Sequence, residues 1–359
     1  MNKEMKKEFT KIKSMSFPRE IIAGHNAIDR LGELCDRFDL TGNALIVTGE
    51  TTDRIFGETL RRVLNDSLIP HQTLKIGNAT RANVNICEKK IRDVNASFLI
   101  SLGGGSKIDI AKLAASELRI PFISVPTTAS HDGISSPRAS LKDEGSVFSV
   151  EAAMPVAIVA DTALIVKSPF RFIAAGCADV IANLTALLDW ELAIRKTDNE
   201  SFSRTAFTMA KIAAETIIEN AGNIKESSEE SVWIVTRQVI ASGLSMGVAG
   251  SSRPTSGSEH LFSHALDLIC PGKALHGEQC GLGTIMMMKL HGGDWEQIRD
   301  ALLRIGAPIT AKAAGFTKDE IVSALLKAAS IRPERRTILN EKKLDRKTAE
   351  RLAKDTRVI

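Results

Sequence analysis

The sequence has no tyrosine among its 359 residues, and aromatic residues make up only 4% of it. If the protein is a reductase, this absence excludes the enzymes whose proton donor is a tyrosine hydroxyl. Cysteine is also scarce, because the five cysteines include no CxxC pair and are odd in number. This pattern is typical of free thiols in a reducing compartment. We therefore expect no disulfides and a cytoplasmic protein.

An excess of charge of one sign is also lacking. The 47 basic and 43 acidic residues are mixed along the chain and leave a net charge of +4. This balance argues against nucleic acid and membrane surfaces as partners and favours a small molecule. The one long apolar segment, "FRFIAAGCADVIANLTALLDW" at 170–190, contains Asp179 and Asn183 and is interrupted by Gly176. We therefore predict a buried helix there and no membrane span.

The order of apolar runs predicts the fold class. Short β-branched runs at 43–49, 71–77, 96–105 and 121–127 alternate with amphipathic stretches, which indicates a parallel sheet with helices on both faces. A hairpin and one further strand are expected within 138–161. From residue 169 onward the pattern is helical, with breaks near residues 222, 250, 271, 292 and 308. We predict an α/β domain at 1–165 and an all-helical domain at 166–359.

Two neighbouring loops of the α/β half favour a nucleotide site. In "LISLGGGSKIDIAK" (99–112) a strand runs through three glycines into a helix, so a phosphate could approach the free amides closely. The motif is neither GxGxxG nor a P-loop, and a tight structural turn is the alternative interpretation. The next strand end releases the hydroxyl-rich "VPTTASHDGISSP" (125–137), where α/β sheets bind ligands.

Three of the seven histidines lie in "SGSEHLFSHALDLICPGKALHGEQCG" (256–281), with one acid just before the first and another just after the third. His260 and His264 are four residues apart, so they share one face of the predicted helix. Two histidines of this segment and a carboxylate from another element would hold a metal with one position open. Asp179 is the candidate carboxylate, because a buried acid needs compensation for its charge. Satisfied core histidines are the alternative.

The chain resembles the archaeal sn-glycerol-1-phosphate dehydrogenases, within the iron-dependent alcohol dehydrogenase and glycerol dehydrogenase superfamily, over nearly its whole length. The motifs that carry the resemblance are "GGGSKIDIAK", "PTTASHDGISSP", "GCADVIANLTALLDW", "SSRPTSGSEHLFSHALD" and "ALHGEQCGLGT". The resemblance implies a Rossmann-like N-terminal domain, a helical C-terminal domain and a site in the cleft. It also implies reduction of dihydroxyacetone phosphate to sn-glycerol 1-phosphate, which supplies the backbone of archaeal ether phospholipids.

The same resemblance assigns the site residues. One zinc ion per subunit would be held by Asp179, His260 and His276, and the substrate would contact Asp132, Asp179 and His264. Asp179 and His264 would be the catalytic residues. NADH or NADPH would be bound by Gly105, Ser106, Lys107, Ile108, Asp109, Thr127, Thr128, Ala129, Ser130 and Ser136. We also expect a homo-oligomer.

Several alternatives stay open. Arg253, just before the helix of His260, would suit the substrate phosphate, and a solvent-exposed arginine is the competing interpretation. Segment 332–339, "RPERRTIL", resembles a C-terminal motif of the same family that usually has an aromatic near Arg336, so its role is open. Zinc, iron and nickel all suit the ligand types. The competing functions are oxidation of unphosphorylated glycerol, a non-catalytic nucleotide-binding protein and, last, a dehydroquinate-synthase-like cyclisation.

Overall fold

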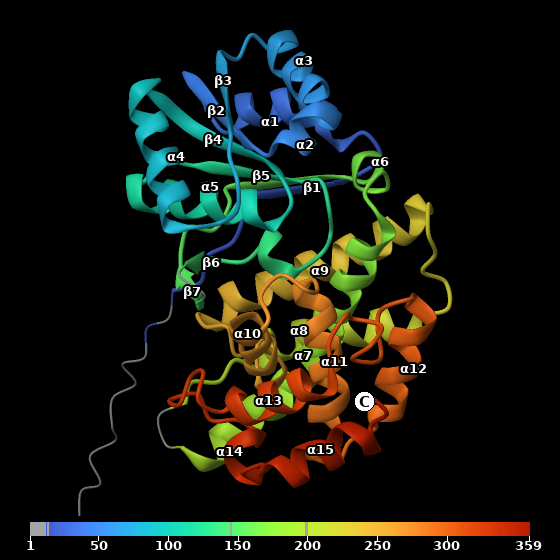
Figure 1. Cartoon of the computed structure of the whole chain (residues 1–359). Helices are drawn as coiled ribbons and strands as arrows, with labels where there is room; N and C mark the ends of the chain where they lie inside the picture. Colours follow the sequence, from blue (N-terminus) through green and yellow to red (C-terminus); the bar gives the residue numbers. More distant parts are fainter. Residues whose placement is uncertain (1–11, 13, 144–145, 198–199) are drawn as a thin grey trace, which may run out of the picture.

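The computed structural model describes residue 12 and residues 14–143, 146–197 and 200–359, and it has an α/β part above a helical part (Figure 1). The α/β part is built on a six-stranded parallel sheet with strand order β1-β8-β5-β4-β2-β3. The strands are β1 (Glu20–Gly24), β2 (Asn43–Thr48), β3 (His71–Lys75), β4 (Ala96–Gly103), β5 (Phe122–Pro126) and β8 (Ala157–Asp161). The predicted parallel sheet followed by helices is confirmed.

Alternating apolar residues bury both faces of the sheet. On β2, Ala44 and Ile46 belong to the core on one face, and Leu45 and Val47 belong to the core on the other. The first core is completed by α1 (Leu31–Arg37) and α3 (Glu58–Asp66), and the second by α4 (Arg81–Asp93) and α5 (Gly105–Leu118). Short turns of helix lie between these elements, namely η1 (Ala27–Arg30), α2 (Glu50–Thr52) and η2 (Asp53–Gly57).

The sequence patterns located most strands of the sheet and missed β1. The four predicted apolar runs contain β2, β3, β4 and β5, and β8 is the further strand expected within 138–161. Strand β1 lies at the edge of the sheet and pairs only with β8, from Glu20↔Ala157 to Gly24↔Asp161. An edge strand of five half-exposed residues carries little of the alternation by which strands are recognised.

The predicted hairpin is also present. Strands β6 (Arg138–Asp143) and β7 (Ser146–Glu151) pair antiparallel, while the turn residues 144 and 145 lie outside the described residues. Figure 1 shows this hairpin at the border between the two parts of the molecule, where β7 contacts α10 (Ser258–Ile269). Lys142 on β6 forms an ion pair with Asp267 on α10, with Nζ 3.3 Å from Oδ1. The hairpin therefore links the sheet to the helical part.

The helical part begins soon after the last strand of the sheet. Its helices are α6 (Thr162–Ile165), α7 (Phe170–Lys196), α8 (Arg204–Glu219), α9 (Glu229–Ala249), α10, α11 (His276–His291), α12 (Trp295–Ile305), α13 (Lys318–Ala328), α14 (Ile338–Lys342) and α15 (Arg346–Asp355). The ends of α8, α9, α10, α11 and α12 fall near the five predicted breaks, whereas the breaks after α7, α13 and α14 were not predicted. Both α7 and α9 are long and apolar enough to span a membrane, but 83% and 67% of their most apolar windows are buried in the structure. The prediction of a buried helix at 170–190 is confirmed.

Glycine allows the two helices that carry the site to pack closely. A Cβ atom on Gly277 of α11 would lie 1.9 Å from the carbonyl oxygen of Ala175 on α7. Likewise, a Cβ on Gly176 of α7 would lie 1.8 Å from the carbonyl oxygen of Ala129, in the loop after β5. No side chain fits at either position without a shift of backbone. These contacts bring Asp179 of α7 close to His276 of α11 and to the loops at the sheet edge.

Candidate active site

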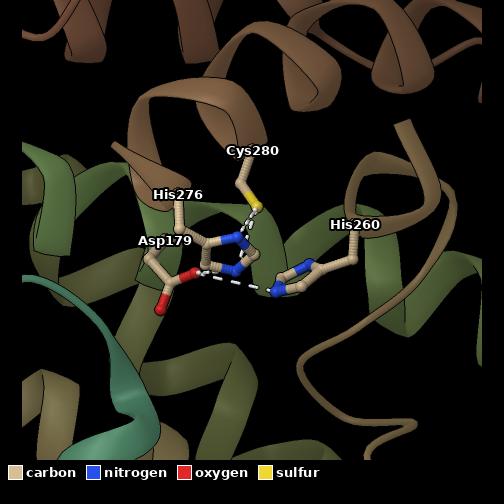
Figure 2. A group of neighbouring side chains, drawn as sticks. All are labelled: Asp179, His260, His276 and Cys280. Carbon is tan, nitrogen blue, oxygen red and sulfur yellow. Dashed lines mark hydrogen bonds and ion pairs between the residues drawn. The ribbon is translucent and has the colours of Figure 1, made fainter. Parts of the chain in front are cut away.

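Four potential metal ligands converge from three helices (Figure 2). The Oδ1 atom of Asp179 on α7 lies 3.7 Å from Nε2 of His260 on α10 and 3.6 Å from Nε2 of His276 on α11. The Sγ atom of Cys280 on α11 lies 3.5 Å from Nε2 of His276. One donor atom of each residue lies within 4.8 Å of those of all the others. The cluster therefore contains all three of the predicted metal ligands and one residue that was not predicted.

The carboxylate of Asp179 fits a cation at this position. Its Oδ1 atom is buried and accepts no hydrogen bond from the described residues, whereas Oδ2 accepts the backbone N–H of Asp132 at 3.0 Å. Burial and the neighbouring Asp132 carboxylate raise the pKa of Asp179 to about 7. A divalent cation facing Oδ1 would satisfy this oxygen and stabilise the charged carboxylate. The donor set of one carboxylate oxygen and two imidazoles is one that zinc and iron accept.

Hydrogen bonds orient both histidine ligands. Nδ1 of His260 lies 2.9 Å from Oε1 of the fully buried Glu259, and this carboxylate also accepts from Thr185 at 2.7 Å. The proton on Nδ1 leaves Nε2 to face Asp179. Nδ1 of His276 lies 3.1 Å from the hydroxyl of Ser263, which turns its Nε2 toward the same point. The acid before the first histidine therefore has a role in this arrangement that the sequence did not reveal.

The histidines differ in charge because their surroundings differ. Burial lowers the pKa of His264 to about 3, with contributions from His260 and Arg332, so its ring is neutral. Burial and His260 also hold the pKa of His276 well below its usual value. Burial opposes a charge on His260, but Cys280 and Glu259 beside it raise its pKa well above the usual value. A charged His260 ring carries its second proton on Nε2, and a cation bound at Nε2 takes the place of this proton.

A cavity of about 590 Å³ joins this cluster to the sheet edge. It brings together seven of the predicted site residues, namely Ser106, Asp109, Asp132, Ser136, His260, His264 and His276. Asp179 lies behind this lining. The Nδ1 atom of His264 is buried and has no hydrogen-bond partner among the described residues. Such a cavity, with few polar groups converging on it, is the usual form of a small-molecule site.

The remaining residues predicted to bind the cofactor follow the ends of two paired strands. Gly105, Lys107 and Ile108 lie in the first turn of α5 after β4, and Thr127, Thr128, Ala129 and Ser130 follow β5. The two loops therefore lie side by side at the carboxyl edge of the sheet, as the pattern predicted. The side chains at these positions differ in how free they are to contact a cofactor. Ile108 is fully buried in the core, and Asp109 binds the backbone N–H of Ser140 at 3.1 Å and Lys112 at 3.4 Å.

Other residues around the cavity were missed by sequence reasoning. Lys112 is fully buried and donates to the carbonyl oxygens of Gly133 and Arg138, at 2.6 Å each, so it fixes the loop after β5. It lies within the glycine-rich motif, but its spacing gave no hint of this contact. Arg332, in the segment left without a role, lines the cavity and has no hydrogen bond or ion pair within the described part of the chain. Cys280 could have been found from its position four residues after His276.

The structure corrects the interpretation of Arg253. Its side chain is buried, not solvent-exposed, and its guanidinium binds both carboxylate oxygens of Glu200, at 3.0 and 2.5 Å, and the carbonyl oxygen of Arg336 at 2.9 Å. It lines a neighbouring cavity of about 420 Å³ and not the one beside the histidines. Because a paired and buried guanidinium has few free donors for a ligand, the structure gives no support to Arg253 as the phosphate site.

Comparison with known proteins first identifies the class. The family model for iron-containing alcohol dehydrogenases matches residues 22–169. The fold is similar to that of glycerol dehydrogenase from Schizosaccharomyces pombe, with a TM-score of 0.79 and 21% identity over 97% of this chain and 91% of that chain. It is also similar to a probable glycerol dehydrogenase from Sinorhizobium meliloti, with a TM-score of 0.77 and 20% identity over 97% and 100% of the two chains. The fold is therefore the one shared by these solved glycerol dehydrogenases, and the matching family model is that of the iron-containing alcohol dehydrogenases.

Curated relatives then identify the family. The chain is 50% identical to the NAD(P)+-dependent glycerol-1-phosphate dehydrogenase of Methanosarcina mazei over 97% of both chains. It is 48% identical to the enzyme of the same name from Picrophilus torridus, over 98% of this chain and 99% of the relative. The protein belongs to the NAD(P)+-dependent glycerol-1-phosphate dehydrogenase family.

Proposed function

We propose that this protein reduces dihydroxyacetone phosphate to sn-glycerol 1-phosphate with NADH or NADPH, at one zinc ion held by Asp179, His260 and His276. The observation that carries the proposal is the buried Oδ1 atom of Asp179, which faces two imidazole nitrogens at 3.6 and 3.7 Å beside the cavity. The names of the relatives, which specify glycerol 1-phosphate and NAD(P)+, support the choice of substrate and cofactor. In the source cells the product would supply the backbone of ether phospholipids.

Different residues of the site would bind the metal, the cofactor and the substrate. When bound, the zinc ion supplies a Lewis acid that polarises the ketone and stabilises negative charge on its oxygen. The loops after β4 and β5, with Ser136, would hold the nicotinamide cofactor along the sheet edge. Glu259 and Ser263 fix the two histidine ligands, and the backbone N–H of Asp132 fixes Asp179. The cavity would then hold the substrate between the α/β part and the helical part, at the carboxyl ends of the strands.

His264 and Asp132 are assigned to the substrate hydroxyls. The neutral ring of His264 lines the cavity and can relay a proton to the alcohol oxygen as a hydrogen-bond donor or acceptor. Asp132 accepts from the hydroxyl of Ser242 through Oδ2 at 3.1 Å, which leaves Oδ1 for a substrate hydroxyl. These assignments complete the predicted substrate-binding set of Asp132, Asp179 and His264.

The substrate phosphate is assigned to Arg332 in place of Arg253. Three basic residues, Arg138, Lys142 and Arg332, line the cavity. The guanidinium of Arg138 donates to Ser149 and Lys142 pairs with Asp267, so Arg332 has the most free donors for a dianion. Arg332→Ala should raise KM for dihydroxyacetone phosphate by about 10- to 100-fold, because a charge-assisted hydrogen bond contributes about 1.5–3 kcal/mol. It should change KM for unphosphorylated dihydroxyacetone far less.

The matched control is Arg336→Ala, because Arg336 is four residues further along and pairs with Glu341. This variant should leave both KM values unchanged. Equal effects of Arg332→Ala on the two substrates would refute the phosphate assignment.

The experiment that tests the whole proposal is an assay of the purified protein with dihydroxyacetone phosphate or dihydroxyacetone and each reduced cofactor. We expect turnover of the phosphorylated substrate, a product of sn-glycerol 1-phosphate configuration, loss of activity after chelation and recovery with zinc. Recovery with iron or nickel alone would assign a different metal. Faster turnover of the unphosphorylated ketone would make the protein a glycerol dehydrogenase instead.

We propose three further properties of the molecule. The domain boundary lies near residue 165, so the domains are 1–165 and 166–359; the end of β8 at Asp161 and the start of α7 at Phe170 support this division. The protein is cytoplasmic, which the five free and buried cysteines support. It forms a homo-oligomer, which light scattering on the purified protein would measure.

A further inference from the structure

Cys280 lies against the metal ligands and has no role in the proposed function. It follows His276 by four residues on α11, so both side chains project from the same face of this helix. Figure 2 shows its sulfur pointing at the imidazole of His276, with Sγ 3.5 Å from Nε2 and 3.9 Å from Nδ1. The side chain is fully buried.

A buried cysteine is often only a small apolar side chain, but the distances here favour a ligand. A tetrahedral zinc site with bonds of about 2.0–2.3 Å holds its ligand atoms about 3.3–3.6 Å apart. The Sγ–Nε2 distance of Cys280–His276 is 3.5 Å, and the Oδ1–Nε2 distances of Asp179–His276 and Asp179–His260 are 3.6 and 3.7 Å. The sulfur therefore lies about as far from its neighbour as the fourth corner of such a tetrahedron requires.

We propose that the Cys280 thiolate is a fourth protein ligand of the metal in the substrate-free enzyme. The inference rests on the metal site of the proposed function and adds sulfur to its oxygen and two nitrogens. On coordination the metal takes the place of the thiol proton, which is released to solvent. A soft sulfur ligand favours zinc and cobalt over hard cations such as magnesium. Substrate binding remains compatible, because catalytic zinc sites can expand to five ligands.

Cobalt(II) substitution tests the proposal directly. The full-length protein is stripped of metal, loaded with one equivalent of cobalt(II) and examined by absorption spectroscopy without substrate or cofactor. We expect an intense sulfur-to-cobalt charge-transfer band in the near ultraviolet, together with the weaker visible bands of tetrahedral cobalt. Cys280→Ala should lose the charge-transfer band and keep visible bands, because the other three ligands remain.

Cys270→Ala is the matched control, since Cys270 is another buried cysteine, at the end of α10, and is absent from the donor cluster. It should keep the charge-transfer band at full intensity. Stoichiometric cobalt in the wild-type protein without this band would overturn the sulfur ligand and leave the three-ligand site intact. Wild-type protein that takes up no cobalt would overturn the sulfur ligand and also the metal site of the proposed function.

Discussion

At the scale of single residues, the chemistry of the site follows from one buried oxygen. A buried polar atom without a partner costs about 1–3 kcal/mol, and more when it is charged. Oδ1 of Asp179 is such an atom among the described residues, and it faces the Nε2 atoms of two histidines. Each histidine is fixed from behind by Glu259 or Ser263. The buried carboxylate oxygen therefore lacks a partner in the described part of the chain, and a divalent cation between it and the two imidazole nitrogens would supply one.

Removal of a metal ligand should remove the metal. We expect Asp179→Ala and His276→Ala each to lose bound zinc and to reduce kcat/KM by more than about 100-fold, because Lewis-acid stabilisation of the transition state is lost. Metal content by mass spectrometry and steady-state kinetics measure the two effects. His25→Ala is the control, since this exposed histidine pairs with Glu229 and is absent from the donor cluster, and it should retain full zinc. Stoichiometric zinc in both ligand variants would contradict the site.

The role of His264 can be tested through pH. Its pKa is lowered by burial to about 3, so the ring is neutral above about pH 4 and its protonation cannot produce an acidic limb between pH 5 and 8. His264→Ala should lower kcat by about 10²- to 10⁴-fold. The acidic limb of the pH profile should stay where it is in the wild type. Full turnover in the variant, or an acidic limb that disappears with the histidine, would refute the assignment.

At the scale of elements, the packing of α7 against α11 decides whether the ligands meet. Asp179 and His276 lie on different helices, and the two helices approach so closely that only glycine fits at position 277. The same approach places Gly176 against the loop after β5, which carries Ala129. Helix packing therefore couples the metal ligands to the cofactor loop, and the hydrogen bond from the backbone N–H of Asp132 to Oδ2 of Asp179 joins them directly.

Gly277→Ala should separate the helices. Its Cβ atom would lie 1.9 Å from the carbonyl oxygen of Ala175, so α11 must shift and carry His276 away from Asp179. We expect a loss of about 1–3 kcal/mol in the free energy of unfolding, measured with urea, and a loss of bound zinc. Gly222→Ala is the control, because nothing lies within 4 Å of its Cβ position, and it should be as stable as the wild type or slightly more so. Wild-type zinc content and stability in Gly277→Ala would show that the helix pair tolerates a wider separation.

At the scale of the whole molecule, the proposed zinc ion and the proposed cofactor bind to two different parts of the chain, and both parts border one cavity. The candidate metal ligands all come from α7, α10 and α11, whereas the candidate cofactor residues come from the loops at the sheet edge. The hairpin β6–β7 connects the two through Lys142 and Asp267. Zinc and the nicotinamide cofactor should therefore each stabilise the fold independently. Turnover in the shared cavity should require both of them.

The independence of the zinc site and the cofactor site can be tested by measuring how each bound molecule changes the free energy of unfolding. Zinc or NADH at 100 times its Kd should each raise the free energy of unfolding by about 2.7 kcal/mol. In His276→Ala the zinc effect should vanish and the NADH effect should remain, because this side chain belongs to the metal cluster and not to the cofactor loops. Thermal unfolding with each ligand makes the measurement. Loss of the NADH effect in this variant would mean that the cofactor loops depend on the metal cluster.

The order and kind of most elements could be read from local sequence patterns. Five of the six strands of the sheet, the hairpin and the helix breaks near residues 222, 250, 271, 292 and 308 were predicted, because hydrophobic periodicity and turn residues act over a few neighbouring positions. The spacing of His260 and His264 on one helix face is equally local. Asp179, His260 and His276 were named as ligands from the family motifs, and the structure places their donor atoms together.

Which side chains from distant elements meet could not be predicted from these local patterns and is seen in the folded chain. It placed Cys280 among the ligands, tied Arg253 to Glu200, left Arg332 free at the cavity and paired β1 with a strand much later in the chain. Sequence periodicity fixes the face on which a residue lies but not the partner that this face meets. That choice depends on close packing between helices and sheet, which glycines at positions 176 and 277 permit through contacts between segments far apart in the chain.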